Sequence, residues 1–214
     1  MNRKNILKEA IIWIIILVPI VYYFAVRQQL PPRVPVHFDV QGHPNGYAAP
    51  NTFLWYIIGM TLGVYLLMLL VPLIDPKKKI QLMGRKYFSF KVLIVTMMSA
   101  LSVFMIFNAI HPNFNPKIFL VIIISVVFIA FGNYLPSLKP NYFIGIRTPW
   151  TLESEENWRL THRLAGWLWT IGGLLLLIVC LILPKAFYLE IGITVVLVLI
   201  PLIYSFVLYL KQKK

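Results

Sequence analysis

Six long apolar stretches separated by polar segments constrain this chain more than any other feature of its sequence. An α-helix rises about 1.5 Å per residue, so roughly 20 apolar residues cross the roughly 30 Å hydrocarbon core of a bilayer. The predicted spans cover residues 8–26, 53–74, 92–110, 117–135, 164–183 and 187–210. Because 59% of the 214 residues are hydrophobic, we predict an all-α integral membrane protein. Its fold is expected to be a bundle of six transmembrane helices with ordered outer and inner loops.

The net charge of +13 is distributed unevenly between the two sides of this topology. Sixteen of the 20 Lys and Arg residues fall in the two terminal segments and in the second and fourth loops, which share one side. The other side holds Arg27, Arg33, Lys117 and Lys185. The positive-inside rule therefore predicts that both termini are cytoplasmic. The basic excess indicates orientation and contact with the lipid bilayer, and no direct nucleic-acid binding.

The fourth loop, NYFIGIRTPWTLESEENWRLTH at residues 141–162, holds more hydrogen-bonding side chains than a connector requires. Gly145 permits a turn, because a residue without a Cβ tolerates positive φ. Pro149 biases Thr148 toward extended backbone, and either Thr151 or Ser154 is expected to cap a new helix. Acidic residues at 153, 155 and 156 suit the positive end of that helix.

On a helix that starts near Ser154, Asn157 and Thr161 follow one line, and Trp158 and His162 follow the adjacent one. This spacing predicts a contiguous polar face at the membrane surface. A plain connector anchored by interfacial tryptophans is the alternative. We predict a partner-binding surface made of Asn141, Gly145, Arg147, Thr148, Pro149, Trp150, Asn157, Trp158, Thr161 and His162.

The first outer loop, residues 27–52, is long for a connector. Apolar residues at 34, 36, 38 and 40 alternate with other types, which predicts a short strand that packs its apolar side on the helix ends. Glycine, proline and asparagine at 42–46 predict turns after it. His37, Asp39 and His43 suggest a zinc site with an open position, but their spacing matches no standard zinc motif. No metal or cofactor is therefore predicted.

Several residues inside or beside the apolar stretches carry further expectations. Gly59 and Gly63 have the spacing of a helix-packing face, and Gly172 with Gly173 suggests either close packing or a soft point in the helix. Glu190 is an acid inside an apolar stretch, which is costly and marks a functional candidate, although it lies near enough to the boundary to reach water. Glu9, near the first helix start, is expected to be solvated at the interface.

Two runs of sequence resemble a known family. GNYLPSLKPNYFIGIRTPWTLESEENWRLTHRLAGW, residues 132–167, resembles the signature of the SdpI family of bacterial membrane immunity and signalling proteins. LPPRVPVHFDVQGHPNGY, residues 30–47, resembles the domain of unknown function at the N-terminus of many members. We therefore expect an N-terminal membrane region at 1–74 with the extracellular loop 27–52. An SdpI-like region at 75–214 would follow, with a cytoplasmic signature loop at 136–163.

The resemblance implies an immunity protein of the bacterial cell membrane that is not an enzyme. The resemblance also implies two roles: resistance to a secreted toxic peptide, and signalling by sequestering a cytoplasmic transcriptional repressor at the membrane. The toxin-facing candidates are then His37, Asp39, His43 and Glu190. A transporter or exporter is one alternative, but the helices carry few charges and no inverted repeat is evident. A membrane metal-dependent hydrolase using the outer-loop histidines is the other.

Overall fold

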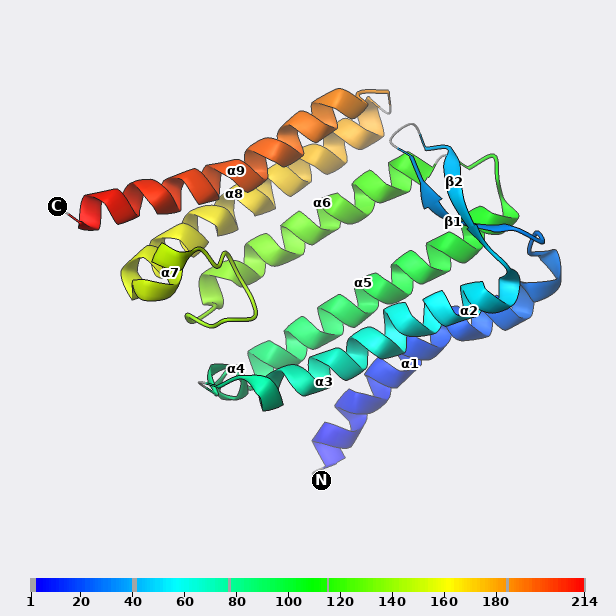
Figure 1. The fold of residues 1–214 in the computed structure, drawn as a ribbon, viewed down its shortest axis with the longest axis horizontal. Helices are drawn as coiled ribbons and strands as arrows, with labels where there is room; N and C mark the ends of the chain where they lie inside the picture. Colours follow the sequence, from blue (N-terminus) through cyan, green and yellow to red (C-terminus); the bar gives the residue numbers. More distant parts are fainter. Residues whose placement is uncertain (1–2, 40–41, 77, 115, 184, 214) are drawn as a thin grey trace. The chain divides into compact units, whose positions relative to one another are not determined.

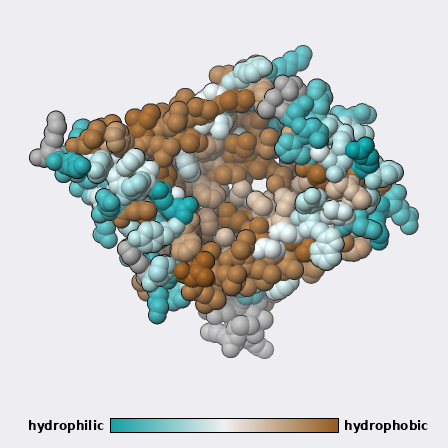
Figure 2. Space-filling model, in the orientation of Figure 1, coloured by the Kyte–Doolittle hydropathy of each residue, from teal (hydrophilic) through white to brown (hydrophobic). Residues whose placement is uncertain are grey.

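The computed structural model describes residues 3–39, 42–76, 78–114, 116–183 and 185–213. This part of the chain contains six helical spans long and apolar enough to cross a membrane, as predicted. They are Glu9–Gln29, Pro50–Ile74, Arg85–Ile110, Pro116–Ser137, Glu155–Ile182 and Phe187–Gln212. On the face drawn in Figure 2, hydrophobic side chains cover the middle of the helices and hydrophilic ones gather near their ends. The all-α membrane fold class is confirmed.

The helices form two compact units. Unit 1 comprises the described residues of 1–74 and 83–119, and unit 2 those of 75–82 and 120–214. Unit 1 therefore includes α5 (Arg85–Ile110), whereas the division predicted from the sequence placed it in the second region. The reason is packing, because α5 lies along α1 (Arg3–Val26). Figure 1 draws both helices, with α2 and α3 of the same unit running alongside them.

Unit 1 is held by two apolar clusters along α1 and α5. Near the outer loop, Tyr23 of α1 packs with Phe53 and Ile106. Further along, Ile12 and Ile16 pack with Tyr65 and Val95. The Ser99 hydroxyl of α5 donates a 2.8 Å hydrogen bond to the carbonyl oxygen of Ile15. Such polar contacts matter here because lipid gives helices no hydrophobic drive to associate.

The second span is not one regular helix. It consists of α2 (Pro50–Ile58), a π-helical turn η2 (Gly59–Gly63) and α3 (Val64–Ile74). The predicted helix-packing role of Gly59 and Gly63 is wrong. A Cβ on Gly59 would meet nothing within 4 Å, and one on Gly63 would meet only the carbonyl oxygen of Ile58. The two glycines instead bound a π-bulge, a feature that changes the direction in which the following side chains point.

The outer loop folds as a β-hairpin. β1 (Val34–Phe38) pairs antiparallel with β2 (Pro44–Ala48), after the short helix η1 (Arg27–Gln29). The predicted strand and its apolar packing are confirmed, since Val34 is buried against the cluster around Tyr23. Position 40, the last of the alternating residues, lies outside the described residues. The second strand was missed because its Asn45–Gly46 dipeptide looks like a turn, whereas the backbone hydrogen bonds that close the hairpin join Asp39 to Gly42 and to His43.

Unit 2 contains the short α4 (Lys79–Leu82), α6 (Pro116–Tyr134) from residue 120 onward, η3 (Leu135–Ser137), α7 (Pro149–Glu153), α8 (Glu155–Ile182) and α9 (Phe187–Gln212). Helix α8 is its centre, because it packs on α9 and on η3. Close approach on both sides requires small residues. A Cβ on Gly173 would lie 2.8 Å from the Ser125 carbonyl oxygen, and one on Gly172 would overlap the Leu197 side chain. The predicted close packing at these two glycines is confirmed.

Candidate functional site

The candidate site is the signature segment, defined here as residues 136–163. It leaves η3, runs without regular structure from Leu138 to Thr148, forms α7, and enters α8. Backbone without helix or strand needs other hydrogen-bond partners, above all near lipid. In this segment buried side chains provide them, so the sequence of polar residues determines the path of the chain.

Asn141 closes the first turn of the signature segment. Its side-chain Nδ2 donates to the carbonyl oxygens of Lys139, at 2.9 Å, and Ile144, at 3.0 Å. Its Oδ1 accepts from the backbone N–H groups of Phe143 and Ile144 at 2.9 and 2.8 Å. Asn141 is buried. One amide thus satisfies four backbone groups, which a solvated connector would leave to water.

His162 holds the middle of the segment through two different hydrogen bonds. The backbone N–H of Ile146 donates to its Nε2 at 3.0 Å, and its Nδ1 lies 2.8 Å from the Trp158 carbonyl oxygen. Because Nε2 accepts, the proton sits on Nδ1, which donates to that carbonyl. Gly145 makes room for this arrangement. Its φ is +119°, and a Cβ there would lie 2.5 Å from His162 Nε2.

Trp158 connects α8 to the start of the segment. Its indole Nε1 donates to the Leu138 carbonyl oxygen at 2.9 Å, and its ring stacks on His162 with centroids 4.0 Å apart. The side chain is 1% exposed. Trp158 is therefore a buried residue that links α8 to the signature segment. It is not an interfacial anchor, as the plain-connector alternative requires.

Two helix starts follow in quick succession. Thr148 has extended backbone, as Pro149 predicts, and its hydroxyl accepts from the Thr151 N–H at 3.3 Å. In return the Thr148 N–H donates to Thr151 Oγ1 at 3.0 Å, so the two threonines cap α7 reciprocally. Ser154 then caps α8, accepting from the Asn157 N–H at 3.1 Å. The predicted Ser154 cap is confirmed, while Thr151 serves the preceding helix from inside it.

Helix α9 supplies the remaining partners. Asn157 Nδ2 donates to the Ser205 carbonyl oxygen at 2.9 Å, and Thr161 Oγ1 donates to Asn157 Oδ1 at 3.0 Å. Trp150 Nε1 donates to the Ser205 hydroxyl at 2.7 Å. Ser205 had not been predicted, because an isolated serine in an apolar helix gives little signal in the sequence.

The structure places the ten predicted partner-binding residues at three levels of exposure. The polar face of α8 is contiguous, and its side chains point into the fold, toward the signature segment and α9. Among the ten residues, Asn141, Asn157, Trp158, Thr161 and His162 are buried. Gly145, Thr148 and Trp150 are half-buried, whereas Arg147 and Pro149 are exposed. The physical reason is that amides, hydroxyls and an imidazole near lipid are best satisfied by backbone groups inside the fold.

Arg147 lies beside a cavity in unit 2. Its guanidinium donates a hydrogen bond to the Tyr142 carbonyl oxygen. The cavity has a volume of about 440 Å³. It is bounded by α6, the signature segment, α8 and α9, and its walls are mainly apolar. The lining residues are Val127, Phe128, Phe131, Leu135, Gly145, Ile146, Arg147, Thr148, Trp169, Val198 and Leu202.

The outer-loop candidates lie apart from this site, in unit 1. His37 and His43 are exposed on the hairpin. His37 Nδ1 is hydrogen-bonded to Asn45, whereas His43 Nδ1 lies 3.4 Å from Asp39 Oδ2. Within the described residues no three His, Cys, Asp or Glu side chains come together as a metal site. The hydrolase alternative has no geometric support at these residues.

Glu190 is buried in unit 2, at the first turn of α9. Its side chain is hydrogen-bonded to that of Cys180 on α8. The sequence left two possibilities for Glu190, an acid inside the apolar stretch or a side chain that reaches water. Because the side chain is buried, the structure contradicts the second. The pair joins the ends of α8 and α9 next to their connecting turn.

An ion pair in unit 1 was missed by the sequence analysis. Lys91 Nζ lies 2.8 Å from Glu9 Oε1, and the Tyr65 hydroxyl donates to Glu9 Oε2 at 2.7 Å. The Lys91 side chain is 6% exposed. Glu9 is therefore not simply solvated at the interface. The two charges are 82 residues apart, so no local pattern in the sequence indicates the pair.

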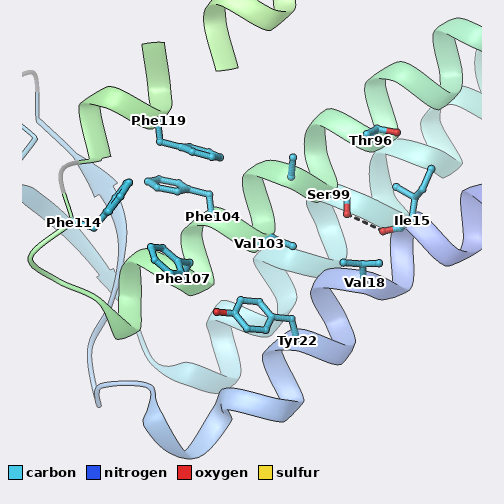
Figure 3. Close-up of a pocket in the computed structure, with 11 residues that line it drawn as sticks. Ile15, Val18, Tyr22, Thr96, Ser99, Val103, Phe104, Phe107, Phe114 and Phe119 are labelled. Atoms are coloured by element: carbon cyan, nitrogen blue, oxygen red, sulfur yellow. Dashed lines mark hydrogen bonds between the residues drawn. The ribbon is translucent and has the colours of Figure 1, made fainter. Parts of the chain in front are cut away.

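Unit 1 also carries an apolar groove of about 680 Å³ between α1 and α5 (Figure 3). Aromatic side chains gather at one end, where the rings of Phe104 and Phe119 stack with centroids 3.6 Å apart. The Ser99 hydroxyl in the groove is turned to the Ile15 carbonyl, as Figure 3 shows. The groove thus offers apolar contact and no free polar group at Ser99.

Comparisons with known proteins agree with these regions. Residues 137–205 match the model of the SdpI/YfhL protein family, and residues 14–62 match that of a domain of unknown function, DUF1648. Over 206 residues the chain is 26% identical to Immunity protein SdpI of Bacillus subtilis (strain 168). The alignment covers 95% of this chain and 92% of that relative. No solved structure matches the chain significantly.

The fold and the site define a multi-pass membrane protein with an internally hydrogen-bonded signature segment between its fourth and fifth spans. The matches confirm the resemblance to the SdpI family, because the SdpI/YfhL model matches residues 137–205 and the DUF1648 model matches residues 14–62. At the family level it is a relative of a membrane immunity protein.

Proposed function

We propose that this protein gives its cell resistance to a secreted toxic peptide. The observation that carries the proposal is that the candidate site lies in the part of the chain that matches the SdpI/YfhL family model. The signature segment lies almost entirely within the family match at 137–205, and the relative with which the chain aligns is named an immunity protein. Buried groups such as Asn141 and His162 act as positioning residues that hold the exposed Arg147 in place.

We also propose that the segment docks a cytoplasmic transcriptional repressor. Its exposed side chains include Arg147 and Arg163, which suit an acidic partner. A preformed surface has less conformational entropy to lose on binding than a mobile loop has. Toxin contact must favour one arrangement of the helices over another for a signal to pass. The outer hairpin with His37, Asp39 and His43 is the proposed first contact, and Glu190 is a further candidate.

The proposal requires an orientation that tags can test. Sixteen of the 20 basic residues lie on the side of the two termini and the signature segment. We therefore expect reporter tags at both termini to be cytoplasmic, and a tag after Asn45 in the outer hairpin to be outside. Alkaline phosphatase and green fluorescent protein fusions at these sites measure it. A cytoplasmic tag at Asn45 would contradict the assignment of both surfaces.

Deletion of the gene from its own host tests immunity directly. The deletion strain should lose viability in culture supernatant of the wild-type strain, and a plasmid copy should restore it. A copy with Arg147→Ala should restore survival at least tenfold less well. The reason is that this residue is the exposed arginine that the buried network positions.

Arg159→Ala is the matched control for that experiment. It removes the same charge from the same exposed segment but does not line the cavity beside Arg147. It should restore survival like the unaltered copy. Membrane-fraction blots must show equal protein for both variants. Equal survival of the deletion and wild-type strains would refute the proposed immunity, whereas equal rescue by both variants would refute only the role of Arg147.

A further inference from the structure

The cavity in unit 2 combines a long apolar wall with a single cationic side chain. Val127 and Phe131 of α6, Trp169 of α8, and Val198 and Leu202 of α9 line it. All five lie within membrane spans. Its volume of about 440 Å³ falls in the range of roughly 300–1,000 Å³ that is usual for ligand pockets. The wall is therefore suited to a hydrocarbon chain.

The polar end of the cavity is formed by the signature segment. Gly145, Ile146, Arg147 and Thr148 line it there, and Arg147 is the charged member of the lining. One guanidinium nitrogen, Nη1, donates to the Tyr142 carbonyl oxygen, which fixes the orientation of the group. The guanidinium has five N–H donors in a planar fork, so others remain for an anion. Arginine binds phosphate through paired, charge-assisted hydrogen bonds.

We infer that this cavity binds one anionic phospholipid, with an acyl chain between α6, α8 and α9 and the phosphate at Arg147. Charge complementarity favours this occupant over a zwitterionic lipid, because the described lining carries one positive group and no acid. A lipid is also present in the bilayer at high concentration, where the apolar wall lies. The bound lipid would brace Gly145–Thr148 from the cavity side. This inference does not depend on the proposed immunity function.

Native mass spectrometry of the full-length protein tests the inference. The protein is purified in a mild detergent and titrated with phosphatidylglycerol or phosphatidylcholine of the same acyl chains. We expect one phosphatidylglycerol to be retained at low lipid concentration, with at least tenfold weaker retention of phosphatidylcholine. Arg147→Gln should weaken the retention of phosphatidylglycerol at least tenfold. Arg159→Gln, the matched control, should leave it unchanged.

A second pair of variants approaches the cavity from α9 and leaves Arg147 intact. Val198→Phe should fill the cavity and weaken phosphatidylglycerol retention, whereas Val195→Phe, on the same helix but not part of the cavity lining, should not. This pair decides the matter if Arg147→Gln fails to fold. Equal retention of the two lipids by the unaltered protein would overturn the inference. So would undiminished phosphatidylglycerol retention in a folded Arg147→Gln or Val198→Phe protein.

Discussion

Gly145→Ala is expected to lower the free energy of unfolding by about 3 kcal/mol, because two costs coincide at this position. The φ of +119° strains any residue with a Cβ. The new Cβ would also lie 2.5 Å from His162 Nε2 and displace the acceptor of the Ile146 N–H. A buried N–H without a partner costs roughly 1–3 kcal/mol. The strain and the lost hydrogen bond both act in the centre of the signature segment.

Cys180 gives a direct measurement of this effect. It is the single cysteine of the chain and is buried, so its labelling by a thiol-reactive fluorophore during heating reports unfolding. Gly145→Ala should melt well below the unaltered protein. Gly192→Ala is the matched control, because a Cβ there meets nothing within 4 Å and alanine favours the helix. Identical melting of the Gly145→Ala and unaltered proteins would contradict the strained, close-packed geometry.

Lys91→Met is expected to cost about 3 kcal/mol, since it leaves the Glu9 carboxylate facing apolar surroundings without its cation. The Lys91 side chain is 6% exposed and that of Glu9 is 32% exposed. Water can therefore solvate part of the Glu9 carboxylate, but it hardly reaches the Lys91 ammonium group. Glu9→Gln should be similarly costly, because it strands the buried ammonium group. The double variant should lose less than the sum of the two, since no unpaired charge remains.

The same thiol-labelling melt measures this double-mutant cycle. Arg85→Met on the same helix is the control, because Arg85 is exposed. It should change stability by no more than about 0.5 kcal/mol. Tyr65→Phe removes only the hydroxyl that donates to Glu9, so its cost should be smaller, about 1 kcal/mol. Strict additivity of Lys91→Met and Glu9→Gln would show that the two charges do not interact.

The sequence by itself determined the features that depend on neighbouring residues. Hydrophobic runs of sufficient length predicted all six spans, because bilayer thickness sets the length of a helix. The alternation at residues 34–38 predicted β1, and Ser154 was recognised as a helix cap. Gly172 and Gly173 were recognised as sites of close packing. For the spans, β1 and the Ser154 cap, the periodicity or contact lies within a few residues of the chain. For Gly172 and Gly173, the small side chain permits close approach of whichever helix packs there.

Only the tertiary structure decided which way the polar side chains point. The lines through Asn157 and His162 were found from helix periodicity, but their partners Leu138, Ile146 and Ser205 come from other parts of the chain. Periodicity locates a face and does not say what covers it. Near a lipid bilayer polar side chains gain most by bonding to otherwise unsatisfied backbone, so this face turned inward and Arg147 stayed outside.

Two features of unit 1 were also not predicted from the sequence, because they depend on which residues pack against them in the tertiary structure. Lys91 was counted as a loop residue because a charge normally ends an apolar stretch, yet Glu9 lets it enter α5 as a buried ion pair. Gly59 and Gly63 have a packing motif but no helix opposite them, so they bound a π-bulge instead. Each outcome depended on a partner distant in the sequence. Lys91 has Glu9 as its partner, whereas a Cβ on Gly59 would meet none of the described residues within 4 Å.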